Sequence, residues 1–564
     1  MSKYQGAEKI RPLLRSVNTI GLFISLMAVV CATTLEASEA ETVDLLTVDD
    51  YLQRVLDHNE RLQISVLQTE VSQRRLKGAK SIFNPEFVSS YQYENRDRPN
   101  TVQQARSLSN LGVFKQENNL MSSAIESLVP GGGRVRIGTS LNRLDNNLQG
   151  ASSLFGGASS PGGEYVTFAG LSLVQPLLKG AWGASMTQIR LAAQDSHIAF
   201  QDYRRELMRV VSRAETLYWD LYYAQQQTEF LSESVSVTGN LLKDTKVKQT
   251  VGSASPLDVL EVESALAQRQ TQLQDAEQAV VENSNRLLSL SSNDTNGYDN
   301  RRLVAIDSPS LFDVSNYNYF DFRLAAEETN PDLLAQRVEV IRQKIRLFYA
   351  KNQRMPQLDF TADYGLNGLG STPGSSMDDL ERSDFASWAV GLELRIPFLV
   401  PGRARHEMEA VKLEVRQAEM GLKSMKTEVS NGIKTALHNV KSTHSSVANH
   451  DKVVGFYQNL LDTQLERFAV GSIDNQEVLE TEEELLEAKI QALLAKVLFR
   501  RAIIQIQILS GKLLNERGVE ISKKQLAEKT QLLLNSDGVD AAAYENYRQS
   551  LRHGFRYTPK TSEE

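Results

Sequence analysis

Residues 59–85 read NERLQISVLQTEVSQRRLKGAKSIFNP, and residues 330–356 read NPDLLAQRVEVIRQKIRLFYAKNQRMP. The two stretches align without a gap: Asn59 and Asn330 lie 271 positions apart (330 − 59), and Pro85 and Pro356 keep the same distance (356 − 85). Each stretch runs from an Asn, through a helix-like segment, to a proline that opens an alternating, strand-like segment. A duplication of this size is typical of a symmetric wall built from repeats and unusual for an enzyme with one active site.

The duplication continues downstream with a shorter offset. The strand exit at Pro176 corresponds to Pro397, 221 positions later (397 − 176). The Val-Gly-Ser triplet around Gly252 corresponds to the one around Gly471, 219 positions later (471 − 252). The second copy is therefore shorter by 50 residues (271 − 221) between its strands and nearly unchanged elsewhere.

The N-terminus is predicted to be a secretory signal peptide. Basic residues precede an apolar run from Ile20 to Val30, and small residues follow it, which is the order that a signal peptidase recognises. A signal anchor is the alternative, although the run is short for crossing a bilayer. Cys31 is the only cysteine and allows a lipoprotein as a third interpretation, but the residues before it lack the expected Leu. The chain then divides into a signal peptide (1–40), repeat 1 (41–300), a linker (301–319), repeat 2 (320–515) and a tail (516–564).

Composition narrows the class of function. The chain has 564 residues and a net charge of −8, and no basic stripe interleaved with aromatics, so we expect no nucleic-acid partner. After the N-terminus no segment holds eighteen uninterrupted apolar residues, so no transmembrane helix is predicted. The exported chain is then either soluble or crosses a membrane by strands.

Two long helical rods are predicted at 182–250 and 403–470. The first has a 4-3-4-3 apolar alternation, and the second has apolar residues every seven positions, both typical of coiled-coil packing. At about 1.5 Å per residue, each rod is about 100 Å long. Each turns at a glycine and returns through a shorter helix. These return helices are predicted at 256–290 and 474–511, and one opening helix per repeat at 47–82 and 320–352.

Strands are predicted between the opening helix and the rod of each repeat. They are bounded by prolines and are about 9 to 11 residues long, which is enough to cross a bilayer. Repeat 1 has an additional predicted hairpin at 117–128 and 133–144. Soluble, half-buried strands are the alternative. Open sheet edges are not tolerated in lipid, and so few strands cannot close a barrel by themselves. If these strands cross a membrane, several chains must therefore share one barrel. The transitions between strand and helix are predicted at Pro85, Pro176, Pro356 and Pro397.

Together these features resemble the outer-membrane factor family of TolC-type outer membrane efflux proteins, over residues 47–515. The resemblance is carried by the duplicated unit, the Asn330-Pro331-Asp332-Leu333 opening, the Gln175-Pro176-Leu177-Leu178 strand exit and the two Val-Gly-Ser turns. It implies an α+β membrane protein: a homotrimer whose transmembrane β-barrel of twelve strands in outer-membrane lipid continues into a long coiled-coil α-helical periplasmic barrel.

The resemblance also implies partners. A periplasmic adaptor would dock to the helical end, and an inner-membrane efflux pump or ABC transporter would drive export, as in efflux or type I secretion. Val251, Gly252, Val470 and Gly471 at the helix turns are the expected adaptor contacts. A buried helix-turn valine is the alternative at both valine positions.

The gate of the channel is expected at these same turns. Glu477 and Glu480 lie six and nine positions after Gly471 and match the family's acidic ring around the constriction. A symmetric ring of carboxylates would favour cations and could bind a divalent ion. Alternatively, the two acids only complement the dipole at the start of a helix.

The corresponding acids in repeat 1 are Asp258 and Glu261. The family's latch at the first position uses a tyrosine and an arginine as donors, where this chain has Phe468 and Ile473. Neither side chain can donate a hydrogen bond, so that latch is predicted to be absent. Arg467 could replace it, or the tip could be held by apolar packing or by another polar network.

No enzyme is expected, and no cofactor or metal. The chain lacks an H-E-x-x-H motif and a phosphate-binding glycine loop. His438, His444 and His450 recur every six residues, which on a helix points successive rings about 240° apart. The competing hypothesis is a periplasmic coiled-coil scaffold without a pore.

Overall fold

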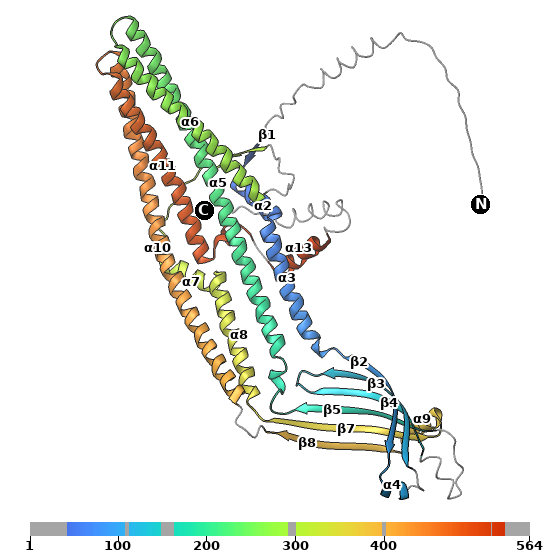
Figure 1. Ribbon diagram of the computed structural model, residues 1–564. Helices are drawn as coiled ribbons and strands as arrows, with labels where there is room; N and C mark the ends of the chain where they lie inside the picture. The colour runs from blue at the N-terminus through green and yellow to red at the C-terminus, as the bar shows by residue number, and fades with distance from the viewer. Residues whose placement is uncertain are drawn as a thin grey trace, which may run out of the picture.

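The computed structural model describes residues 42–107, 112–147, 163–291, 301–396, 402–519 and 522–535. It has a bundle of long helices at one end and an antiparallel sheet at the other, and helices run directly into strands where the two meet (Figure 1). The predicted signal peptide, Cys31, Pro397 and the end of the predicted tail lie outside the described residues.

The predicted rods are confirmed as α5 (Thr187–Thr250) and α10 (Gly402–Ala469), which have 64 and 68 residues. Their return helices are α6 (Pro256–Ser291) and α11 (Asn475–Ser510). Most of the seven-residue seam of α10 is buried, because it packs against α11 and α8. The first rod begins later than predicted, since a 3₁₀ turn, η3 (Trp182–Ala184), occupies its expected start.

The prediction of one opening helix per repeat is wrong. Each consists of two helices: α2 (Val48–His58) and α3 (Glu60–Lys80) in repeat 1, and α7 (Tyr319–Thr329) and α8 (Pro331–Gln353) in repeat 2. The break lies at Asn59 and at Asn330, whose backbones are extended, with ψ of 115° and 118°. Each Asn caps the second helix by accepting a backbone N–H three residues later.

The same two asparagines tie each repeat together. The side-chain amide of Asn59 donates to the carbonyl of Leu290 at 3.2 Å, and that of Asn330 donates to the carbonyl of Leu509 at 3.0 Å. Both carbonyls lie in the last turn of a return helix, where the chain leaves them without an intrahelical partner. The Asn that recurs in the sequence is therefore a joint between opening and return helices.

The strands form one sheet with the order β2-β3-β4-β5-β7-β8, antiparallel throughout. They have 10 to 16 residues, longer on the whole than predicted. The predicted extra hairpin is β3–β4, which lies within the sheet. Their bounds are β2 Glu86–Pro99, β3 Val113–Leu128, β4 Arg134–Asn146, β5 Glu164–Pro176, β7 Gln357–Gly370 and β8 Ala386–Arg395.

Prolines mark the ends of β2, β5 and β7 where strand and helix meet, as predicted. Pro85 and Pro356 stand one residue before β2 and β7, and Pro176 is the last residue of β5. The twelve-strand barrel implied by the resemblance would need four strands from each of three chains. The sheet of this chain has six strands, because β3 and β4 pair with their neighbours on both sides.

A small parallel pair of strands, β1 (Thr42–Leu46) and β6 (Arg301–Ala305), was not predicted. It packs into a core beside the middle of α5, where the buried hydroxyl of Tyr218 donates to the carbonyl of Leu46 at 2.9 Å. The predicted linker at 301–319 thus begins with a strand. The remaining short elements are η1 (Ser81–Phe83), α4 (Val102–Ser107), α9 (Pro373–Arg382), α12 (Leu513–Glu516) and α13 (Lys523–Asn535).

Candidate functional site: the helical tip and the strand wall

The helical tip consists of two hairpins, α5–α6 and α10–α11, which turn at Gly252 and Gly471. Both glycines have φ of +78°, a conformation that other residues adopt only with strain. The N–H of each following serine donates to the carbonyl five residues before it, which satisfies a free carbonyl at the helix end. Val251 and Val470 are 74% and 79% exposed, so the alternative that they are buried is wrong.

The two predicted gate acids lie at the start of α11. Glu477 and Glu480 are both exposed. The N–H of Glu477 donates to Oδ1 of Asp474 at 3.1 Å, and Glu480 accepts from the amide of Gln476 at 2.8 Å. Their carboxylates complement the helix dipole and remain accessible to solvent, so one role does not exclude the other. A ring of acids requires several copies of the chain, and it stays a prediction.

Asp258 forms its hydrogen bonds within its own hairpin. Its carboxylate accepts the N–H of Ser255 at 2.7 Å, and its own N–H donates to the Ser255 hydroxyl at 3.2 Å, a reciprocal cap at the start of α6. The hydrogen bonds from Ser255 lower the pKa of Asp258. Glu261, one turn further, is exposed. Neither acid has a hydrogen bond or ion pair to the second hairpin within the part of the chain that the structure describes.

The second hairpin is held by a residue that sequence reasoning missed. Phe468 is buried, and Nζ of Lys248 on α5 lies 3.1 Å from the centroid of its ring. The same ammonium donates to the carbonyl of Phe468 at 2.6 Å. Burial against the ring lowers the pKa of Lys248. Lys248 thus joins the ends of the two rods.

Apolar packing completes this contact. Phe468 and the partly buried Ile473 belong to a cluster with residues of all four helices: Leu241, Val262, Leu461, Val478 and Leu485. Arg467 is exposed and forms no ion pair with any described residue. Its predicted role as a substitute latch would need a neighbouring chain and stays a prediction.

A buried ionic network lies further from the tip. Arg269 of α6 and Glu482 of α11 form an ion pair at 3.2 Å, with side chains only 7% and 6% exposed. Ser234 of α5 donates its hydroxyl to the same carboxylate. The network joins three helices from both hairpins. Its sequence signal is that Arg269 occupies a seam position, seven residues after Val262 and seven before Ala276, where an apolar residue is the norm.

The two faces of the sheet differ in the rows of side chains near its helical end. Directly paired residues point to the same face. One row that crosses all six strands is entirely apolar, with exposures from 44% to 75%: Phe87, Ile125, Ile137, Leu171, Tyr364 and Trp388. The adjacent row, on the opposite face, is mostly charged or polar: Glu86, Glu126, Arg136, Ser172, Asp363 and Ala389. This alternation is typical of strands with lipid on one side and water on the other.

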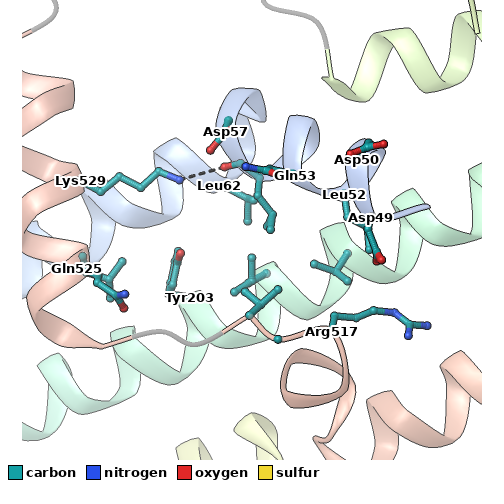
Figure 2. Close-up of a pocket in the computed structure, with 16 residues that line it drawn as sticks. Asp49, Asp50, Leu52, Gln53, Asp57, Leu62, Tyr203, Arg517, Gln525 and Lys529 are labelled. Carbon is teal, nitrogen blue, oxygen red and sulfur yellow. Dashed lines mark hydrogen bonds between the residues drawn. The ribbon is translucent and has the colours of Figure 1, made fainter. Parts of the chain in front are cut away.

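The beginning of the predicted tail is packed onto the helices. A cavity of about 180 Å³ is lined by residues of α2, α5 and α13, by Leu62 of α3 and by the residues that follow α12. Figure 2 shows Tyr203, Gln525 and Lys529 among the side chains that line it. Nζ of Lys529 donates to the carbonyl of Leu56 at 3.0 Å, and Arg517 pairs with the buried Glu215 at 3.0 Å. Burial lowers the pKa of Lys529. These contacts hold Arg517 against the rod α5 and hold α13 against the opening helix α2.

Over the described residues, no helix is both long and apolar enough to span a bilayer. Nor does any group of three or more His, Cys, Asp or Glu side chains in the described ranges have an arrangement that could hold a metal ion.

Comparison with known families decides the class. The family model described as "Outer membrane efflux protein" matches residues 134–293 and 324–512, which is most of both repeats. The chain belongs to this family. It is therefore an outer-membrane efflux channel, located in the outer membrane.

Individual relatives agree with this assignment. The outer membrane protein TolC of Vibrio cholerae is 22% identical over 367 residues, 63% of this chain and 80% of TolC. TolC of Escherichia coli is 23% identical over 354 residues, 61% of this chain and 69% of TolC.

Solved structures share the fold. The Campylobacter jejuni outer membrane channel CmeC has a TM-score of 0.59 at 16% identity, with 86% of this chain and 89% of CmeC covered. The outer membrane protein VceC of Vibrio cholerae has a TM-score of 0.57 at 12% identity, with 83% and 96% covered.

Proposed function

We propose that this chain is the exit duct of a tripartite efflux or type I secretion system and works as a homotrimer. The six-stranded sheet is here called the strand wall. The observation that carries the proposal is that this wall is continuous with the two rods, α5 and α10. A sheet with one exposed apolar face and two open edges is not stable in lipid by itself. Rods of about 100 Å are also far longer than a compact domain needs. Three copies around one axis would close the wall and enclose a helical tunnel.

Docking of the periplasmic adaptor is supported by the shape of the tip. The exposed Val251 and Val470 project from the two turns. Beside them, a groove of about 470 Å³ lies between α5 and α10. An adaptor's helical hairpin could lay apolar residues into this groove. Its walls are Val237, Asn240, Leu241, Asp244, Val247, Lys248, Leu465, Phe468 and Ala469. The inner-membrane pump or ABC transporter would supply substrate and energy.

Gating at the tip is supported by the exposed acids of α11. In a trimer, Glu477 and Glu480 would each occur three times around the axis, and their fields would add within the narrow bore. Such a ring attracts cations and repels anions. The closed tip would be held by the Lys248–Phe468 contact and the buried network of Arg269 and Glu482.

Single-channel conductance of the purified protein in a planar bilayer tests the proposal. Native protein should give a small, cation-preferring conductance. The Glu477→Ala/Glu480→Ala variant should conduct more or lose its cation preference. The matched control is Glu466→Ala, which removes an exposed acid from α10 near the same tip. If both forms are folded and neither conducts, the pore is refuted and the scaffold hypothesis gains support.

A further inference from the structure

The two repeats contribute unequal numbers of strands to the strand wall. Repeat 1 contributes β2, β3, β4 and β5, and repeat 2 contributes only β7 and β8. The hairpin β3–β4 lies between β2 and β5 with continuous register on both sides. It therefore cannot leave the sheet without disconnecting β2 from the rest of the wall.

The inserted hairpin has the same two faces as its neighbours. Ile125 and Ile137 pair with each other and belong to the exposed apolar row. On the opposite face, Glu126 and Arg136 pair across the same two strands and form an ion pair at 3.4 Å. Met121 and Leu141 pair on the same face as Ile125 and Ile137, with Ser123 and Thr139 between the two apolar pairs. Apolar side chains that predominate on this part of the outer face fit a membrane wall better than a loop in water.

The turn of this hairpin is fixed to the junction of strands and helices. The carbonyl of Gly131 accepts the N–H of Trp182 at 2.8 Å and the side-chain amide of Gln175 at 3.0 Å. The carbonyl of Pro130 accepts the hydroxyl of Ser185 at 2.6 Å. Gln175 is the last residue but one of β5, and Trp182 and Ser185 precede α5. The turn is thus held where the rod begins, which sets the height of β3 and β4 in the wall.

The two outer strands, β2 and β8, each have a partner on one side only in the described sheet. With six antiparallel strands, β2 and β8 run in opposite directions. An edge β8 of one chain can therefore pair with β2 of a second copy in the antiparallel sense used everywhere else in the sheet. This pairing is strongly favoured in lipid, because each backbone group left without a hydrogen bond there costs several kcal/mol.

We infer that the barrel has eighteen strands (3 × 6), with β3–β4 of each copy as part of the wall. The inference rests on the trimer of the proposed function. At a strand spacing of about 4.8 Å and a tilt of about 40°, eighteen strands give a ring about 36 Å across, and twelve give about 24 Å. Four helices per chain reach the sheet, namely α3, α5, α8 and α10. Twelve helices packed about 10 Å apart give a ring about 38 Å across.

The wider barrel therefore continues the helical tunnel with little narrowing. Large solutes that enter the tunnel, including protein chains, would be selected at the helical tip and not by the width of the barrel outlet. Barrels of sixteen to eighteen strands generally leave an open aqueous channel.

Electron cryo-microscopy of the full chain in lipid nanodiscs tests this inference. Native protein should show eighteen strands around a three-fold axis. A variant without residues 113–146, which lacks β3 and β4, should show twelve. If the native wall has twelve strands and the hairpin lies outside it, the inference is overturned while the trimeric channel stands. If no closed ring forms in lipid, the proposed function fails as well.

Disulfide cross-linking keeps the test decisive if the shortened variant does not insert. Ser90→Cys on β2 is combined in turn with Ser387→Cys, Ala389→Cys and Gly391→Cys on β8, all on the polar face. Oxidation should give a covalent trimer. The parallel series with Ser140→Cys on β4 in place of Ser90→Cys should give none. Cross-links from β4 and none from β2 would mean that β4 is the true edge, which contradicts an eighteen-strand wall.

Discussion

Removal of the Glu482 carboxylate should loosen the helical bundle where α11 packs against α5 and α6. Glu482→Ala leaves the guanidinium of Arg269 buried, with Glu483 at 3.7 Å as the only other acid within ion-pairing distance among the described residues. Breaking a buried ion pair by removing one partner costs about 3–5 kcal/mol. Because the side chain of Glu483 is largely exposed, it offsets part of this loss, and we expect about 3 kcal/mol.

Hydrogen exchange read by mass spectrometry measures this effect locally. A loss of about 3 kcal/mol corresponds to amide exchange more than 100-fold faster in the turns of α6 and α11 around Arg269 and Glu482. The strands, which are far from the network, should keep their native rates. The double variant Arg269→Met/Glu482→Leu replaces the pair with apolar side chains and should recover most of the protection, since such replacements are often neutral or stabilising.

The control is an exposed pair on the same helix. Arg286 and Glu282 lie 3.8 Å apart on the surface of α6. Glu282→Ala should change exchange less than threefold, because exposed pairs one turn apart contribute about 0.3–0.5 kcal/mol. The reasoning is refuted if Glu482→Ala behaves like this control, or if the double variant is as unprotected as the single one.

Three further outcomes follow from the other contacts. Asn330→Ala should lower the free energy of unfolding of the α7–α8 joint by about 1–2 kcal/mol. Hydrogen exchange should then be faster at the start of α8. Asn330→Asp should retain the cap and lose only the hydrogen bond to the carbonyl of Leu509. Ile137→Asp should prevent assembly in the outer membrane, because it places a carboxylate on the lipid face, while Arg136→Asp on the polar face should still fractionate with the membrane. The cap of α6 should weaken only in acid: the pKa of Asp258 is lowered in the folded chain, so its contribution is complete above the ordinary aspartate pKa and is lost as the pH falls through the folded value. Asp258→Asn should abolish that acid dependence of exchange at the tip, and an unchanged pH profile would contradict the assignment.

Much of the architecture was predictable because its signals are local. The seven-residue seam of α10, the glycines at both turns and the prolines beside the strands each act through backbone conformation or through one face of one helix. The recurrence of these signals at constant spacing was enough to predict a duplicated unit with long rods and a membrane wall.

The sequence pattern does not predict the breaks at Asn59 and Asn330, although both residues mark the repeat. At Asn330 a local signal is present, because Pro331 disfavours a helical backbone at the residue before it and is favoured at the start of a new helix. At Asn59 no proline follows, a helix-like pattern continues, and the side-chain amide bonds to a partner far away in sequence, the free carbonyl of Leu290. Local periodicity carries no information about such a partner.

The sequence by itself determined the repeats, the rods, the turns and the alternation of the strands, because neighbouring residues set these properties. Only the tertiary structure decided that β3–β4 joins the wall, that Lys248 lies against Phe468, and that Arg269 meets Glu482 across 213 positions. Strand order and buried charge pairs depend on which distant segments come together. That choice is made by the packing of the whole chain and not by any single stretch of it.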